Sequence, residues 1–291
     1  MRLVVIIVTA DRKEVVGQAL ARLESQTRRP DHVIVSAPDE SHLDRSIRTT
    51  FPITFALNAR GCTAQRNRAL DSAAMAHADA VVFFDDDFVP ANDYLESVER
   101  VFDSHADWPV LTGHVLADGV KGPGLSYDQA LGLLDAPPST DPSRHEAITS
   151  AGAYGCNMAY RAAAIGTLRF DERLPLYGWQ EDTDFSRRVA RGVPVIRHHA
   201  LKGVHLGVKG GRVSGVRFGY SQIANPVYLV RKGTGSSRWA TNLIARNILA
   251  NAALSFRPEA HVDRPGRLKG NLIAFGHLLR GRIDPEFITQ L

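Results

Sequence analysis

The sequence predicts an α/β fold in which a mostly parallel central sheet has helices on both faces and further helices follow at the carboxyl end. Short apolar runs rich in Val, Ile and Phe alternate with longer segments whose apolar residues recur at helical spacing. These short runs are continuously apolar, which is typical of parallel strands covered on both faces. After residue 221 the pattern becomes helical only. The length of 291 residues, 44% of them hydrophobic, allows a sizeable core.

The first half of the chain contains four predicted strands, with helices between them. Residues 3–9 are apolar and β-branched, and the segment KEVVGQALARLESQ that follows has its apolar residues at helical spacing. A glycine-containing loop leads into a second helix in NARGCTAQRNRALDSAAMA. The remaining strands are predicted at 31–36, 52–57 and 80–84. Ligands of such sheets gather beyond the carboxyl ends of the strands, so we expect the functional residues at that edge.

The second half is less regular. Pro90 is predicted to open a helix over 90–102, and a strand follows at 110–117. Residues 118–150 are rich in Gly, Pro, Ser and Asp and predict a long surface loop or lid. Beyond it we expect a segment that returns to the core, a helix ending at Gly192, a strand, and a glycine- and base-rich loop. The returning segment is at 152–161, the helix at 181–192, the strand at 193–200 and the loop at 205–215. Two long helices are predicted at the end of the chain, at 236–256 and 267–281.

Charge and cysteine content exclude some classes of protein. The 35 Lys and Arg against 31 Asp and Glu give a formal net charge of +4, which lacks the concentrated basic stripe of a nucleic-acid-binding protein. Cys62 and Cys156 have no spacing typical of a metal site, and so few cysteines fit a reducing cytosol. The opening run MRLVVIIVTA is too short for a signal peptide or a spanning helix. We expect a cytoplasmic protein, with peripheral contact to the inner face of the plasma membrane left open.

Three consecutive aspartates, Asp85, Asp86 and Asp87, follow the fourth predicted strand. Adjacent carboxylates repel one another, so keeping all three ionised requires open water or a nearby cation. Side-chain alternation would place Asp85 and Asp87 on one side and Asp86 on the other. Oxygen ligands of this kind suit Mg²⁺ or Mn²⁺, which fill their other positions with water and substrate phosphates. A solvated acidic turn is the alternative.

A second acidic group lies at a predicted helix start, where Glu181, Asp182 and Asp184 occur. The amino terminus of a helix favours ionised carboxylates, so an acid there can serve as a general base at neutral pH. Ordinary helix capping is the alternative. The preceding Trp179 offers an aromatic surface for a sugar ring, or it is a core residue.

The third group is His205 with Lys209 and Arg212 in VHLGVKGGR. A neutral imidazole can complete a carboxylate metal site, and cations beside glycines can hold phosphates. A structural histidine in a solvated basic loop is the alternative.

Taken in this order, the motifs resemble those of a family 2 glycosyltransferase of the GT-A fold, a Rossmann-like fold for transfer from nucleotide-diphosphate sugars. The resemblance rests on the stretches VVIIVTADR, SQTRRPDHVIVS, RGCTAQRNRAL, FFDDDFVP, GCNMAYR and GWQEDTDFSRRV. It implies a GT-A catalytic domain over 1–220. The extension over 221–291 is then expected to pack on this domain, at a dimer or membrane interface.

The resemblance also implies roles for single residues. Thr9, Arg12 and Asp39 would lie near the base and ribose, and Arg66 near the base or diphosphate. Asp85 and Asp86 would border the nucleotide, and Lys209 or Arg212 would contact its phosphates. Asp87 would be the principal ligand of Mn²⁺ or Mg²⁺ and His205 a second one. Asp182 would be the catalytic base, with Glu181 as its neighbour and acceptor contact. The family often has an acidic pair followed by Gly-Ser after the second strand, where this chain has SAPDES.

The function implied is that of an inverting, metal-dependent, hexosyltransferase-type enzyme. It would move a sugar from a nucleotide-diphosphate sugar to a glycan or lipid-linked acceptor, in bacterial surface polysaccharide or glycolipid synthesis. One alternative is a catalytically silent glycan-binding or assembly subunit with the same fold. A sugar-phosphate nucleotidyltransferase is another, but it should carry a glycine-rich, arginine-containing loop where this chain has TADRKEVVG.

The carboxyl-terminal helices allow two further interpretations. One helix could place an amphipathic face on a membrane, built from the apolar residues Trp239, Leu243, Ile244, Ile248, Leu249 and Leu254 with Arg238, Arg246 and Arg257 among them. Packing on the catalytic domain or in a homodimer is the alternative, and it is the one we favour from the sequence.

Overall fold

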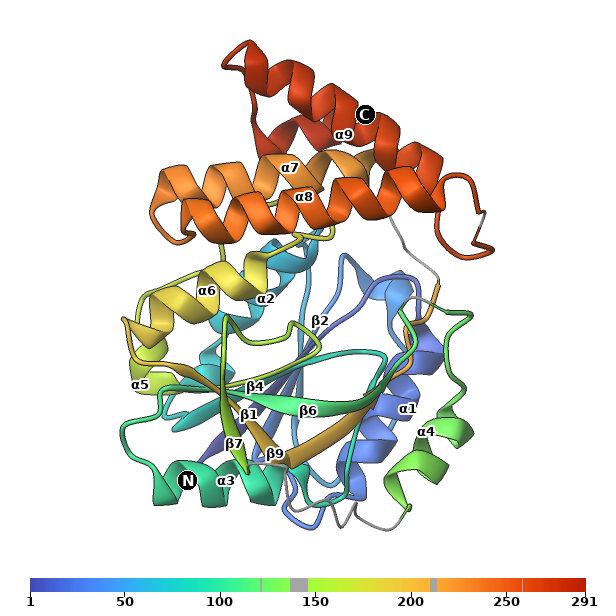
Figure 1. The fold of residues 1–291 in the computed structure, drawn as a ribbon. Coiled ribbons are helices and arrows are strands. Elements are labelled where there is room, and N and C mark those ends of the chain that lie inside the picture. The colour runs from blue at the N-terminus through green and yellow to red at the C-terminus, as the bar shows by residue number, and fades with distance from the viewer. Residues whose placement is uncertain (121, 137–145, 210–213, 258) are drawn as a thin grey trace.

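A computed structural model gives the structure of the chain, and it describes residues 1–291 except 121, 137–145, 210–213 and 258. Within the described residues one sheet has the strand order β3-β2-β1-β4-β8-β6-β9-β5, and β7 pairs with β9 (Figure 1). Its strands are β1 (Leu3–Val8), β2 (His32–Ser36), β3 (Ile53–Ala56), β4 (Ala80–Asp85), β5 (Phe88–Pro90), β6 (Val110–Asp118), β7 (Ala147–Ser150), β8 (Asn157–Arg161) and β9 (Val195–His205). The predicted α/β class is confirmed.

Parallel pairing brings the ends of three strands level. β1 pairs with β2 on one side and with β4 on the other, and β2 pairs with β3, all in parallel. Val8 is in register with both Ser36 and Asp85. The predicted meeting of strand ends at one edge is therefore confirmed. On the other side of β4 the sheet is mixed, because β8 runs antiparallel between β4 and β6, whereas β6 and β9 are parallel.

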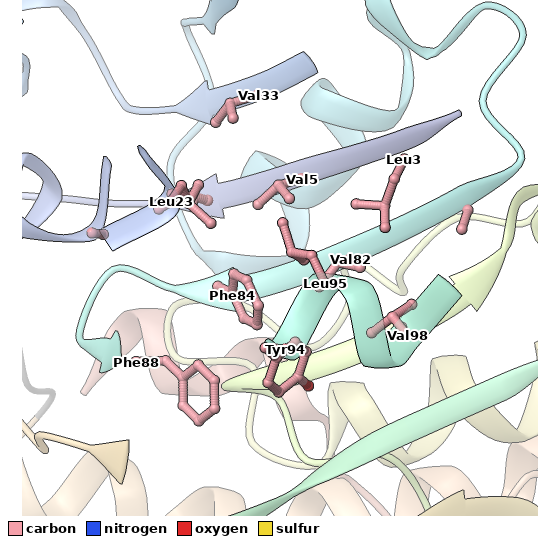
Figure 2. Close-up of a cluster of buried hydrophobic side chains, with 14 of the residues drawn as sticks. Leu3, Val5, Leu23, Val33, Val82, Phe84, Phe88, Tyr94, Leu95 and Val98 are labelled. Carbon is pink, nitrogen blue, oxygen red and sulfur yellow. The ribbon is translucent and has the colours of Figure 1, made fainter. Parts of the chain in front are cut away.

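Helices cover both faces of the sheet. In chain order the helical elements of this part are α1 (Lys13–Glu24), η1 (Glu40–His42), α2 (Cys62–Leu70), η2 (Ala73–Met75), α3 (Tyr94–Ser104), α4 (Tyr127–Leu134), α5 (Ala162–Ile165) and α6 (Glu181–Ala190). Because side chains alternate along a strand, Val5 packs in one core with Leu23 and Leu95, as Figure 2 shows. Val4 and Ile6 face the opposite core, which contains Leu70 and Phe185.

Two predictions about the middle of the chain were wrong. Pro90 does not open a helix: it ends β5, which pairs antiparallel with β9, and α3 begins only at Tyr94. Residues 118–150 are not one long loop, because they contain α4 and β7. The Ser126 and Gln129 side chains form a capping box at the start of α4, which local sequence could have indicated. The central part of the predicted loop lies outside the described residues.

The carboxyl-terminal helices form a layer at one end of the molecule, next to α2 and α6 (Figure 1). They are α7 (Gly215–Lys232), α8 (Ser237–Leu254) and α9 (Arg264–Leu279), followed by the 3-10 helix η3 (Pro285–Gln290). They share a small apolar core around Tyr220 and Ile223. The residue boundary expected at 220 falls inside α7. In the described residues no helix combines the length and the hydropathy that crossing a bilayer requires.

Close approach and buried amides fix the packing of these helices. A Cβ at Gly219 or Gly270 would lie 2.0 Å from a backbone oxygen of the facing helix, so both positions require glycine. Asn251 Nδ2 donates to Gln222 Oε1 at 2.7 Å and to Asn271 Oδ1 at 2.9 Å. Because buried amides must be paired, this network allows one register of α7, α8 and α9.

An ion-pair network joins this layer to α6. Asp184 is fully buried, and its carboxylate accepts from Lys232 Nζ at 2.8 Å and Thr234 Oγ1 at 2.7 Å. Arg188 Nε donates to the same carboxylate at 2.9 Å. The start of α6 is thereby held in a fixed position relative to α7.

Candidate active site

A cluster of potential metal ligands lies where β4 and β9 end. Ligand atoms of Asp85, Asp87 and His205 lie within 4.8 Å of one another, the one such group found in the described residues. Asp85 and Asp87 share this cluster, as predicted, but the chain turns at Asp86 and Asp87 between β4 and β5, so alternation along an extended strand does not place them there. Two carboxylates and an imidazole suit Mn²⁺ or Mg²⁺, with the nitrogen ligand favouring Mn²⁺.

Asp87 is buried and held from several directions. Its Oδ2 accepts from the backbone N–H of Val208 at 2.8 Å, and its Oδ1 lies 3.3 Å from Nε2 of His205. Arg12 Nη1 is 3.5 Å away. Burial opposes ionisation, but the hydrogen bond and charge of His205 outweigh it and lower the pKa of Asp87. The Asp87 carboxylate is therefore kept ionised and oriented.

His205 lies between two carboxylates. Its Nδ1 is 3.1 Å from Oδ1 of Asp118, and Oδ2 of Asp118 accepts from the Tyr154 hydroxyl at 2.8 Å. Although burial opposes it, hydrogen bonding to Asp118 and Asp87 raises the pKa of His205 to about 10. The same contacts overcome burial and lower the pKa of Asp118 to about 2. A metal-bound imidazole must be neutral, so binding of a cation here releases a proton.

Sequence reasoning missed Asp118 and Tyr154. Asp118 is the last residue of β6, so its place as an acidic residue at a strand end was the available signal. The contact itself depends on the parallel pairing of β6 with β9, which places Asp118 opposite His205.

Asp86 organises the residues that follow β1. Its carboxylate accepts from Thr9 Oγ1 at 2.8 Å and from Arg12 Nη1 at 2.9 Å. Burial raises the pKa of Asp86 to about 7 against the opposing charge of Arg12. Thr9 and Arg12, which were predicted to lie near the nucleotide, are thus brought together at the sheet edge.

Arg66 connects the two acidic motifs. Its side chain is only 2% exposed, and its guanidinium donates to Asp85 Oδ1 at 3.1 Å, to the carbonyl of Gly155 at 3.0 Å and to Glu181. The guanidinium also lies over the ring of Phe170. Arg66 therefore joins the end of β4 to the start of α6.

Asp182 and Glu181 differ in how their oxygens are used. Asp182 accepts from the backbone N–H of Gly155 at 2.9 Å and of Thr183 at 2.6 Å. Burial raises the pKa of Asp182, with these two hydrogen bonds opposing. Burial also raises the pKa of Glu181 to about 8, against the charge of Arg66. Oε2 of Glu181 is buried and has no hydrogen-bond partner among the described residues.

The loop before α6 presents two aromatic side chains. Leu176, Gly178 and Gln180 all have positive φ, between 60° and 73°, so the loop is tightly folded. Trp179 is half-buried against Phe218 of α7, with ring centroids 5.8 Å apart, which is a packing arrangement. Tyr177 is 54% exposed, and sequence reasoning did not single it out. Its ring centroid lies 5.9 Å from that of Phe218, and burial together with the charges of Asp85 and Asp182 raises the pKa of Tyr177.

The other predicted site residues lie further from the cluster or outside it. Asp39 caps η1 by accepting from the Ser41 N–H at 2.9 Å, and its side chain is 3.9 Å from Arg60. Lys209 Nζ donates to the carbonyls of Gly119 and Val120, which ties the segment after β9 to the end of β6. Arg212 lies outside the described residues.

The sheet order and the acidic edge define the chain as a GT-A-like α/β domain of the kind that handles nucleotide sugars. The protein-family model described as Glycosyl transferase family 2 matches residues 4–169, which is more than half of the chain. The chain therefore belongs to that family. No curated protein matches the sequence.

Solved structures show the same fold at low sequence identity. Residues 1–349 of TarS from S. aureus, in complex with UDP-GlcNAc, match with a TM-score of 0.58 and 17% identity, covering 100% of this chain and 84% of that one. A mannosyltransferase from Pyrobaculum calidifontis, in complex with GDP-Man and Mn²⁺, matches with a TM-score of 0.54 and 15% identity. The match covers 99% of this chain and 85% of that one. A longer TarS structure matches with a TM-score of 0.54 and 17% identity. This match covers 88% of this chain but only 44% of that one.

Proposed function

We propose that the chain is an inverting, metal-dependent, hexosyltransferase-type enzyme. Membership of glycosyl transferase family 2 supports sugar transfer, and the nucleotide sugars bound in the similar structures support a donor of that class. One observation supports the finer proposal: Arg66 connects Asp85 of the metal-binding cluster to Glu181, the neighbour of Asp182. A donor held at the cluster would therefore have a carboxylate base on the adjoining helix.

In this proposal Asp85, Asp87 and His205 hold Mn²⁺ or Mg²⁺, and the cation supplies neutralisation of charge on the departing diphosphate. Thr9 and Arg12, fixed by Asp86, line the nucleotide side, with Asp39 further out. Lys209 and Arg212 are proposed to contribute positive charge near the phosphates.

The chemical step proposed is a single displacement at the anomeric carbon. Asp182 takes the proton of the acceptor hydroxyl while the acceptor oxygen forms its bond to the anomeric carbon. The bond between that carbon and the diphosphate oxygen breaks at the same time, so the configuration inverts. Glu181, whose buried Oε2 has no hydrogen-bond partner among the described residues, is proposed to contact the acceptor. Tyr177, which is exposed on the loop before α6, is proposed to contact the acceptor sugar.

The nucleotide sugars bound in the similar structures are suitable donors for testing the proposed activity. We expect UDP-GlcNAc or GDP-Man to be hydrolysed slowly by the purified chain with Mn²⁺ and transferred to a suitable glycan or lipid-linked acceptor. Asp87→Ala should abolish Mn²⁺-dependent binding of the donor, measured by calorimetry, while Asp103→Asn, at an exposed position on α3, should not. Unchanged affinity in Asp87→Ala would remove the metal assignment. A catalytically silent subunit would bind the donor without turnover.

The acceptor and the setting remain proposals. Bacterial surface polysaccharide or glycolipid synthesis follows from the resemblance, and a lipid-linked acceptor would require the site to work beside a membrane.

A further inference from the structure

The outer sides of α8 and α9 carry large apolar side chains that no part of the described chain covers. Phe256 is 88% exposed, Leu279 85%, Leu249 69%, Leu272 66% and Phe275 40%. A monomeric soluble protein scatters single exposed apolar residues, but a group of them on two packed helices indicates a contact surface. We call this surface, with the basic residues described next, the α8–α9 outer face.

The charged residues on α8 and α9 are all basic, although the segments that flank α9 contain Glu259, Asp263, Asp284 and Glu286. Residues 237–257 and 264–282 contain eight Lys and Arg and neither Asp nor Glu. Six of the eight basic residues are exposed: Arg238, Arg246, Arg257, Lys269, Arg280 and Arg282. The mild net charge of the whole chain therefore conceals a local basic surface.

Helical spacing places the apolar and basic side chains together. At 100° per residue, Arg238, Leu249 and Phe256 lie on nearly the same line along α8 and its end. On α9, Leu272, Phe275 and Leu279 follow one side. Lys269 and Arg280 lie on the adjoining strip. The opposite sides of both helices are occupied, because Asn251 on α8 and Gly270 and Ala274 on α9 are buried against the helical layer.

The structure partly buries several residues of the membrane face that was predicted from the sequence. Ile244 and Ile248, part of the membrane face considered from the sequence, pack against the apolar core of the helical layer. Trp239 packs under the guanidinium of Arg187 on α6. The exposed surface keeps Leu249 and the three arginines of that predicted face, and it adds Phe256 and the exposed residues of α9.

We infer that the α8–α9 outer face binds the surface of an anionic lipid bilayer as a peripheral contact. Phe256 and the leucines would enter the interfacial region, while the arginines and Lys269 meet lipid phosphates. A second copy of the chain fits this face poorly, because a two-fold contact would bring the basic side chains of α8 and α9 together, and neither helix carries a carboxylate to pair with them. The bilayer supplies the missing negative charge.

Hydrogen bonds connect the helical layer to α6 and to the loop that precedes it. Lys232 and Thr234 bind Asp184, and Asn225 Nδ2 donates to the carbonyl of Trp179 at 2.7 Å. A bilayer bound at the α8–α9 outer face would therefore be held at a fixed distance from the start of α6.

Co-sedimentation of the full chain with vesicles tests the inference. We expect binding to phosphatidylcholine vesicles that contain phosphatidylglycerol, little binding to phosphatidylcholine alone, and release at high salt. Lys269→Gln with Arg280→Gln should weaken binding about 30-fold, because each basic residue near an anionic surface contributes about 1 kcal/mol. Phe256→Ser with Leu279→Ser should weaken it by at least about tenfold through lost apolar contact.

Matched controls use exposed positions elsewhere. Leu116→Ser with Leu133→Ser, and Arg2→Gln with Arg48→Gln, should bind vesicles like the natural chain, and all variants should keep its donor hydrolysis in solution. Absence of binding to anionic vesicles, or binding that survives both outer-face variants, would overturn the inference. A dimer in solution that the outer-face variants dissociate, without vesicle binding by the natural chain, would assign the face to a second copy and overturn it equally.

Discussion

The Asp118 carboxylate lies 3.1 Å from Nδ1 of His205, while Nε2 of the same imidazole faces Asp87. A carboxylate behind a ligating histidine fixes the orientation of the ring and increases its basicity. Asp118 is therefore the residue through which β6 shapes the proposed metal site.

Replacing Asp118 tests this arrangement. Asp118→Asn should weaken Mn²⁺ binding about 10- to 100-fold, as loss of such an outer partner typically does. Calorimetry with Mn²⁺ in the presence of UDP would measure the change, with Asp103→Asn as the control. Equal affinity of Asp118→Asn and the control would show that His205 does not need this partner.

Asp182 is expected to act in turnover rather than in donor binding. Asp182→Asn should lower kcat about 10²- to 10⁴-fold, because an amide cannot take the acceptor proton. Affinity for the nucleotide should stay close to that of the natural chain. Steady-state transfer rates and calorimetry would separate the two effects, and near-normal kcat would exclude Asp182 as the base.

Arg66 is expected to be needed for folding as well as for the site. Arg66→Met leaves the buried Glu181 and the nearby Asp85 without their cation, which should lower the free energy of unfolding by about 3–5 kcal/mol. Urea unfolding would measure this, with the exposed Arg68→Met as the matched control. A loss no larger than that of the control would contradict a central role for the ion pairs.

Tyr177 is expected to contact the acceptor. Tyr177→Ala should raise the acceptor KM about 2- to 10-fold through loss of an aromatic contact, whereas Tyr177→Phe should keep most of it. Donor KM should change little in either variant. A change confined to the donor KM would move Tyr177 to the nucleotide side.

The link between α6 and α7 is expected to depend on pH. Lys232 Nζ lies 2.6 Å from Oδ2 of Asp171, and although burial opposes it, this hydrogen bond lowers the pKa of Asp171 below its ordinary 3.8. A lowered carboxyl pKa stabilises the fold fully above the unfolded value, and the contribution is lost as pH falls through the folded value. Lys232→Met should therefore cost about 2–3 kcal/mol at pH 7, and the difference should shrink below about pH 4.

Urea unfolding of the natural chain and Lys232→Met across this pH range would check the prediction. Lys202→Met, on the sheet, is the comparison. A difference that stays constant as pH falls would mean that Asp171 is not the partner that matters.

The sequence by itself determined the features that depend on local periodicity. The apolar runs at 3–9 and 80–84 form β1 and β4. Because these two strands pair in parallel, their carboxyl ends lie at the same edge of the sheet. Such features are readable because backbone geometry alone sets the period of side-chain direction. The grouping of Asp85 with Asp87 was also predicted, although a turn at Asp86 and Asp87 produces it.

Only the tertiary structure decided which distant groups meet. Arg66 contacts Glu181, 115 residues further along the chain, and His205 meets Asp118 because β6 and β9 are neighbours in the sheet. The same holds for Pro90, which ended an edge strand where local rules predicted a helix start. Strand order depends on the packing of the whole core rather than on neighbouring residues, so no local pattern in the chain specifies these contacts.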